Sequence, residues 1–400
     1  ATMEELYLLQ KLARDLGSDN IDHRLHTRDF DDDRNDPQFP WLGVDIAKLE
    51  TADTILVIGS NIRHEVPILA HRLRKAGRSG AKVSFMNPPG YEYLFPIHQY
   101  SSAPLSELGN QLAALLGAVE SDCGQRADLS VPRGPTDDTH RAIAQSLLQG
   151  EQKHLLLGNL ATRHPAFSQL RAISAAIAKM TGATIGYLPE SSNAAGAYLA
   201  GAVPHRGPGG TPISQPGRNA REMLSETRDA YVLFGFEPQH DTAQGQAAIA
   251  TLRDALFVVV LASWLDPTAI EYADVILPIG TFAETAGTYV NMQGDLQSFS
   301  GVAKPVGEAR PGWKVLRVLG NELGLEGYVY NSAEEVLAAA TTEIGDIRPD
   351  NALRGTSSFN GAHYTEADMP ADVSIYAVDP LVRRSRPLQR TRDARKGAEL

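Results

Sequence analysis

Short apolar runs alternate with stretches that repeat apolar residues every three or four positions along most of the chain. The runs at 54–58, 256–261 and 275–277 are continuous, as expected of parallel strands that are covered on both faces. Residues 105–119 carry leucines at helical spacing. Strands that alternate with helices in this way predict parallel βαβ units. We therefore expect an α/β fold with two Rossmann-like lobes, each with a parallel sheet.

The same reading gives the remaining elements and the domain boundaries. Further strands are expected at 83–86, 154–157, 183–188 and 231–234, and further helices at 3–16, 67–76, 165–181, 220–227, 243–253 and 313–323. Residues 203–218 are rich in proline and glycine and are the candidate for a domain boundary. We expect a first lobe at 25–203, a second lobe made of 1–24 and 204–325, and a C-terminal extension at 326–400.

Two charged segments lie outside this pattern. The acidic cluster at 29–34 is typical of a solvated loop and lacks the glycine and glutamate spacing of a calcium loop. The regular pattern ends at about residue 344, and a basic tail follows a short apolar segment at 373–378; its cationic residues are Arg383, Arg384, Arg386, Arg390, Arg392, Arg395 and Lys396. We interpret the tail as an irregular arm that is ordered by packing on a neighbour. The alternative is an electrostatic contact with an acidic partner subunit or a lipid surface.

Composition restricts the possible functions of this 400-residue chain. A net charge of −11 argues against nucleic acid as a partner. The apolar run at 256–262 is too short to cross a bilayer, which takes about 20 residues. The single cysteine, Cys123, is expected in a polar loop and cannot supply the thiolates of an iron–sulfur cluster. Because residue 1 is followed at once by a helix without an initiator methionine, we expect an internal piece of a longer protein.

Polar residues follow the predicted strands, where α/β sheets place their ligands. Gly59, Ser60 and Asn61 follow the first strand with one glycine only, so the nicotinamide-binding fingerprint is absent. His240 and Asp241 follow the strand at 231–234 and are interpreted as a loop turn in preference to an acid/base pair.

Several segments resemble the molybdopterin oxidoreductase family. Residues 52–61 read ADTILVIGSN, residues 272–297 read YADVILPIGTFAETAGTYVNMQGDLQ, and residues 305–313 read PVGEARPGW. These are similar to three signature elements of that family, and the likeness extends from about residue 4 to about residue 325.

The resemblance implies a pterin-dinucleotide cofactor held at the strand ends of two homologous lobes. The rim positions would be Gly59, Ser60, Asn61 and Asn87 in the first lobe, and Gly235, Glu237, Asp241, Asn291 and Gln293 in the second. A plainer interpretation is that these residues only end strands and satisfy loop backbone. Active members carry a cysteine, selenocysteine or serine metal ligand near the segment that reads DNIDHRLHTRD here, at 19–29. His26 and Thr27 are poor substitutes for a thiolate, so we expect no metal ligand, no catalytic residue and a vestigial rim.

Residues 4–14, 19–24 and 234–242 look like the large peripheral-arm subunit of respiratory complex I, the NADH-quinone oxidoreductase. That likeness implies a scaffold domain without its own cofactor, in a parent that passes electrons from NADH toward quinone. The parent's 2Fe–2S and 4Fe–4S clusters would lie N-terminal to this piece. Other peripheral-arm subunits would be its partners, on the cytoplasmic face of a bacterial inner membrane or the mitochondrial matrix side. The alternatives are an active molybdopterin enzyme of the formate dehydrogenase or nitrate reductase type, and a nucleotide-binding regulatory module.

Overall fold

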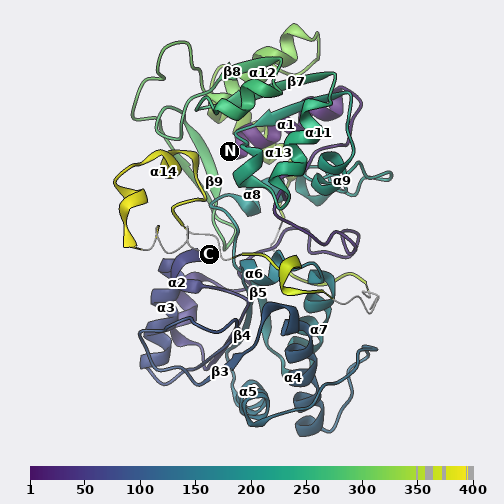
Figure 1. Ribbon diagram of the computed structural model, residues 1–400, viewed down its shortest axis with the longest axis vertical. Helices are drawn as coiled ribbons and strands as arrows, with labels where there is room; N and C mark the ends of the chain where they lie inside the picture. The colour runs from purple at the N-terminus through teal and green to yellow at the C-terminus, as the bar shows by residue number, and fades with distance from the viewer. Residues whose placement is uncertain (348–349, 356–363, 372–374, 393, 395–400) are drawn as a thin grey trace. The chain divides into compact units, whose positions relative to one another are not determined.

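The computed structural model describes residues 1–347, 350–355, 364–371, 375–392 and 394 (Figure 1). Contacts divide the chain into two compact units. Unit 1 comprises residues 1–26, 191–348 and 376–396, and unit 2 comprises residues 27–190, 349–375 and 397–400. Each unit contains a parallel sheet with helices, so the predicted α/β class is confirmed.

Unit 2 is built on a five-stranded parallel sheet in the order β3–β2–β1–β4–β5. The strands are β1 (Thr54–Ile58), β2 (Lys82–Asn87), β3 (Gln99–Ser102), β4 (Lys153–Leu157) and β5 (Thr184–Tyr187). Every residue of β1 is buried, which is why its sequence is a continuous apolar run. The strand order changes direction at β1, so the carboxyl ends of β1 and β4 form the topological switch point of this sheet.

Helices cover both faces of the unit 2 sheet. They are α2 (Ile62–Glu65), α3 (Pro67–Arg78), α4 (Leu108–Cys123), α5 (Asp138–Gln149), α6 (Asn159–Thr162) and α7 (Phe167–Thr181), with 3-10 turns at η1 (Ile46–Thr51), η2 (Leu105–Glu107) and η5 (Glu366–Asp368). Figure 1 shows α2 and α3 on one side of the sheet and α4 and α7 on the other. The predicted loop position of Cys123 is wrong: it is the last residue of α4, and Gly124 ends the helix with a φ of 69°.

The acidic cluster of unit 2 is a loop that is only partly solvated, which corrects the prediction. Asp32 is buried and pairs with the buried guanidinium of Arg171 at 2.9 Å. Asp29 accepts hydrogen bonds from the backbone amide and the hydroxyl of Ser168, at 2.8 and 2.7 Å. The local charge density suggested exposure, but α7 supplies the partners that make burial of these carboxylates possible.

Unit 1 holds a three-stranded parallel sheet in the order β6–β7–β8 and a separate antiparallel hairpin, β9–β10. The strands are β6 (Ala230–Phe234), β7 (Phe257–Ala262), β8 (Val275–Pro278), β9 (Gly287–Val290) and β10 (Leu296–Phe299). The helices are α1 (Met3–Asp15), α8 (Ala194–Ala200), α9 (Ala220–Ser225), α10 (Pro238–Asp241), α11 (Gly245–Arg253), α12 (Gly312–Glu322), α13 (Ala333–Ile344) and α14 (Pro380–Arg384), with η3 (Pro208–Gly210), η4 (Pro267–Glu271) and η6 (Leu388–Arg390).

The first helix belongs to the core of unit 1. Thr2 and Glu5 form the capping box at its start. In Figure 1 the purple α1 lies among the green elements of unit 1, and it contacts α8, α12 and α13. The buried carboxylate of Glu4 accepts from the amide and the hydroxyl of Thr288 on β9, at 2.9 and 2.8 Å. This contact orders part of the segment after β8, where no strand was predicted from the sequence.

The proline- and glycine-rich segment 203–218 lies inside unit 1. Val203 is fully buried, and the guanidinium of Arg14 donates to the carbonyl oxygens of Gly201, Val203 and Arg206, at 3.0, 3.1 and 3.0 Å. Residues 191–203, expected in the first lobe, and α13, expected in the extension, also fall in unit 1. Proline and glycine here mark irregular backbone whose carbonyls are satisfied by a side chain, and such backbone can be buried.

The two faces of the β6–β7–β8 sheet differ in burial. On one face Tyr231 and Val258 are buried against α11 residues such as Leu252. On the other face Val232 and Phe257 are 45% and 46% exposed. Parallel sheets are ordinarily covered on both faces, so this half-open apolar face is unusual. Across the described residues, no helix is both long and apolar enough to cross a membrane.

Candidate functional site

The strand ends of the two units carry the same turn. Gly59 follows β1 and Gly235 follows β6, with φ of 61° and 59°. The amide of Gly59 donates to the carbonyl oxygen of Met86 at 2.9 Å, and that of Gly235 to the carbonyl oxygen of Leu261 at 2.7 Å. A Cβ on Gly59 would lie 2.6 Å from the backbone nitrogen of Ala161, so only glycine fits this left-handed turn without strain. Ser60 and Asn61 follow Gly59 directly, and Glu237 lies two positions after Gly235.

In unit 2 the carboxylate of Glu65 lies at the topological switch point. It accepts from the amide of Asn61 at 2.9 Å, the hydroxyl of Ser60 at 2.7 Å, and the amide of Asn159 at 3.2 Å. Asn61 follows β1 and Asn159 follows β4, so one side chain spans both strand ends. These amides and this hydroxyl are the donors that an anionic ligand would use at such a place.

Asn87, at the end of β2, completes the unit 2 rim. Its side-chain oxygen accepts from the amide of Ser60 and its nitrogen donates to the carbonyl of Ser60, both at 2.8 Å. The same nitrogen donates to the hydroxyl of Tyr93 at 2.7 Å. The structure therefore brings Gly59, Ser60, Asn61 and Asn87 together, but Asn87 is engaged in holding the turn.

In unit 1 the equivalent amide is also capped by an acidic side chain four residues later. The amide of Glu237 donates to Asp241 at 2.8 Å, just as the amide of Asn61 donates to Glu65. The carboxylates of Glu237 and Asp241 both form ion pairs with arginines of α14. Arg383 lies 3.2 Å from Glu237 and 2.8 Å from Asp241, and Arg384 lies 2.8 Å from Glu237. Two members of the predicted basic tail thus bind acidic residues of their own chain, whereas Arg395 and Lys396 lie outside the described residues.

Further polar groups surround these carboxylates. Gln239 donates to the carboxylate of Asp266 at 2.6 Å. Tyr272 is 7% exposed, and no partner of its hydroxyl is found among the described residues. Burial, with the negative charges of Asp266 and Glu237, raises the pKa of the Tyr272 hydroxyl.

Other candidate residues are used elsewhere. Asn291 lies in the turn between β9 and β10, where its side-chain oxygen accepts from the amides of Gln293 and Asp295, both at 3.0 Å. It therefore shapes the hairpin. His26 lies near the rim of unit 1, with Nε2 3.4 Å from the carbonyl oxygen of His240, and it offers no thiolate.

A hollow of about 550 Å³ lies at the opposite, amino end of β1 and β2 in unit 2. Two of its carboxylates are already engaged: Asp53 accepts from the amides of Glu151 and Gln152, at 3.0 and 2.8 Å, and Glu50 pairs with Arg72 and Lys75. We assign no ligand to it.

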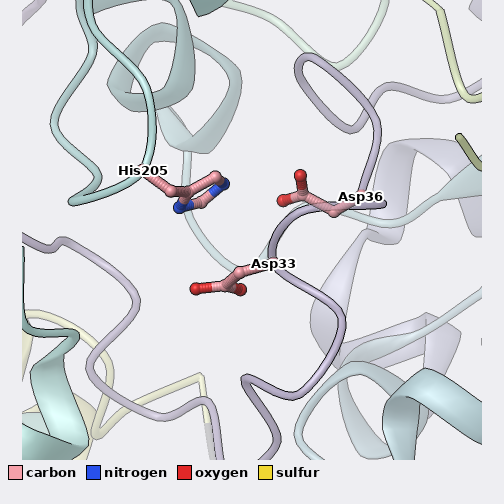
Figure 2. A group of neighbouring side chains, drawn as sticks. All are labelled: Asp33, Asp36 and His205. Atoms are coloured by element: carbon pink, nitrogen blue, oxygen red, sulfur yellow. The ribbon is translucent and has the colours of Figure 1, made fainter. Parts of the chain in front are cut away.

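Two further carboxylates, Asp33 and Asp36, stand in the loop that follows Asp32 (Figure 2). Figure 2 also labels His205, which belongs to unit 1. Two carboxylates of unit 2 are too few oxygen ligands for a calcium or magnesium site, and we build no metal site from them.

Sequence reasoning missed Glu65 and the role of Arg383. A signal for Glu65 was present, because both turns carry an acidic residue six positions after the glycine, at Glu65 after Gly59 and at Asp241 after Gly235. The partner of Arg383 had no such signal, since Asp241 is 142 positions away.

The order of these elements and their strand-end turns can be compared with known proteins. A family model for molybdopterin oxidoreductases matches residues 1–322. The chain belongs to the molybdopterin oxidoreductase family. It is similar to the G subunit of NADH-quinone oxidoreductase from Mycobacterium bovis, with 27% identity over 372 residues, covering 84% of this chain and 42% of that protein. The alpha subunit of an F420-dependent formate dehydrogenase from Methanocaldococcus jannaschii is 25% identical over 427 residues, covering 87% of this chain and 59% of that protein.

This family member therefore spans less than half the length of the Mycobacterium bovis relative. Among solved structures, the formyltransferase/hydrolase complex of Methylorubrum extorquens contains a chain of similar fold, with a TM-score of 0.56 and 15% identity, covering 81% of this chain and 89% of that one. At that identity the likeness supports the fold alone.

Proposed function

We propose that this molybdopterin oxidoreductase family member is a scaffold domain with a degenerate pterin-dinucleotide rim. The observation that carries the proposal is that the chain's own side chains occupy both strand-end turns. Glu65 takes the donors of the unit 2 turn, and Arg383 with Arg384 neutralises the acidic residues of the unit 1 turn.

A dinucleotide phosphate does not fit the unit 2 turn as it stands. The amides of Asn61 and Asn159 already donate to a carboxylate. A phosphate placed against them would have to displace the half-buried Glu65 carboxylate, and the two negative charges would repel each other at short range. We therefore propose no catalytic step that uses a pterin or a metal in this chain.

The parent we propose is the large peripheral-arm subunit of a complex I, the NADH-quinone oxidoreductase. The supporting finding is the 27% identity that covers 84% of this chain. In such a parent, electrons would pass from NADH toward quinone through iron–sulfur clusters held in another part of the same subunit. This piece would supply packing surface to other peripheral-arm subunits, on the cytoplasmic or matrix side of the membrane.

The test combines cofactor analysis with ligand binding. We expect purified protein to contain no stoichiometric molybdenum and to release no fluorescent pterin oxidation product. Pyrophosphate and guanine nucleotides should leave the thermal unfolding of the wild type unchanged. A ligand that does bind, at about 100 times its dissociation constant, would stabilise the folded state by about 2.7 kcal/mol, which this measurement detects. Glu65→Ala should free the amide donors and gain a pyrophosphate-dependent shift, whereas the exposed control Glu92→Ala should not.

Stoichiometric molybdenum with pterin would contradict the proposal and support an active enzyme of the formate dehydrogenase type. Stabilisation of the wild type by a guanine nucleotide, without metal, would support a nucleotide-binding module instead. A wild type that binds pyrophosphate as well as Glu65→Ala does would show that Glu65 does not block the turn.

The half-open face of the β6–β7–β8 sheet gives a prediction about partners. Replacing Val232 and Phe257 with Asp should weaken co-purification with other subunits of the parent complex by about tenfold or more, as removing interface anchors does. Both side chains are nearly half exposed, so the free energy of unfolding of the isolated chain should fall by only about 1 kcal/mol. Leu94→Asp, at an exposed apolar residue of unit 2, is the matched control. If the Val232 and Phe257 variant co-purifies with other subunits as well as Leu94→Asp does, this face is not part of the interface.

A further inference from the structure

We infer that Glu237 and Asp241 form a guanidinium-binding pocket, and that the C-terminal segment 376–392 is a strap whose Arg383–Arg384 pair is the resident ligand. The pocket lies where β6 ends, within unit 1. The Arg383 side chain is 8% exposed and that of Glu237 is 7% exposed, so the contact is buried. Tyr272, more than nine-tenths buried, adds a hydroxyl that has no partner among the described residues.

The geometry selects a guanidinium over an ammonium group. One terminal nitrogen of Arg383 lies 2.8 Å from Asp241, and the other lies 3.2 Å from Glu237. The planar fork of arginine reaches two carboxylates at once, whereas a lysine offers a single nitrogen. The second oxygen of Glu237 receives Arg384 at 2.8 Å, so two cations neutralise two carboxylates.

Further contacts hold the strap on the pocket. Arg383 also donates to the carbonyl oxygen of Ala377 at 2.9 Å, which folds the strap around its own guanidinium. The Arg384 guanidinium lies 5.8 Å from the ring centroid of Trp264, which follows β7. Asp379 caps α14 by accepting from the amides of Leu381 and Val382, at 2.8 and 3.1 Å.

The helix of the strap depends on this docking. The five-residue helix α14 is far below the length of about 12 residues at which isolated helices become marginally stable in water. The backbone amide of Arg383 donates a hydrogen bond to the carbonyl oxygen of Asp379 at 2.9 Å. Amide protons in such hydrogen bonds should therefore exchange slowly only while the strap is bound. Slow exchange in 376–392 thus reports occupancy of the pocket.

Hydrogen–deuterium exchange of the peptide covering 376–392, in the full chain, tests the inference. Arg383→Lys keeps the charge and the helix propensity but loses the fork, and it should raise the exchange rate about tenfold, since a hydrogen bond to a charged group contributes about 1.5–3 kcal/mol. Glu237→Gln combined with Asp241→Asn should do the same. Arg390→Lys, at an exposed arginine of the same strap, should leave the rate unchanged.

A second measurement uses the wild type and needs no variant to fold. The dipeptide acetyl-Arg-Arg-amide, at tens of millimolar, exceeds the roughly millimolar effective concentration of a tethered segment, and it should accelerate exchange of the strap. Acetyl-Lys-Lys-amide at equal concentration should not. Unprotected amides in the wild type, an Arg383→Lys variant that behaves as the wild type, or equal action of the two dipeptides would each overturn the inference.

Discussion

Arg171→Ala is expected to lower the free energy of unfolding of unit 2 by about 3–5 kcal/mol, because it leaves the buried Asp32 carboxylate without its guanidinium. The two side chains are 7% and 4% exposed and 2.9 Å apart. Burial by itself lowers the pKa of Arg171, but its neighbours Tyr187, Asp36 and Asp32 raise that pKa overall. Urea unfolding followed by tryptophan fluorescence measures the effect, with Trp41 reporting on unit 2 and Trp264 and Trp313 on unit 1.

The control is an exposed pair of the same type. Arg141 and Asp138 are 2.6 Å apart, but their side chains are 52% and fully exposed. Arg141→Ala should cost less than about 1 kcal/mol. The double variant Arg171→Met with Asp32→Leu removes both buried charges and should recover most of the lost stability. If Arg171→Ala costs no more than Arg141→Ala, the buried pair does not hold the acidic loop on α7.

Acidification is expected to remove about 2 kcal/mol of unfolding free energy between pH 7 and pH 5 through His154 alone. Burial lowers the pKa of this residue on β4 from 6.5 to about 4. The unfolded chain therefore binds a proton at His154 near pH 6.5, while the folded chain binds it only near pH 4. Since the unfolded state takes up more protons across that window, stability falls as the pH falls.

His154→Gln should flatten this part of the pH profile, whereas His71→Gln, at an exposed position of α3, should leave the profile unchanged. Urea unfolding at pH 7, 6 and 5 gives the comparison, with each variant measured at the same ionic strength. A pH slope in His154→Gln equal to that of the wild type would show that His154 is not the titrating group.

Much of the fold could be predicted from local patterns, because a strand that is buried on both faces has a continuous apolar sequence. The buried strand β1 was predicted with its observed bounds, and α1 was predicted to within one residue of its observed end. The hairpin β9–β10 left no such mark, because β10 is largely exposed and β9 is held by a carboxylate from α1. The acidic cluster at 29–34 was misread for a related reason, since its partner Arg171 lies 139 positions away.

The candidate site divides in the same way. The α/β class, the family resemblance and the positions of both strand-end turns could be predicted from the sequence, because strands, glycines and spacing are local properties. The groups that those turns hold are a matter of tertiary contacts. Glu65 accepts from amides that follow two different strands, and Arg383 binds Asp241 across 142 positions of sequence. Such contacts depend on which strand ends and which distant segment come together, and that is set by the topology of the sheet and the docking of the C-terminal segment.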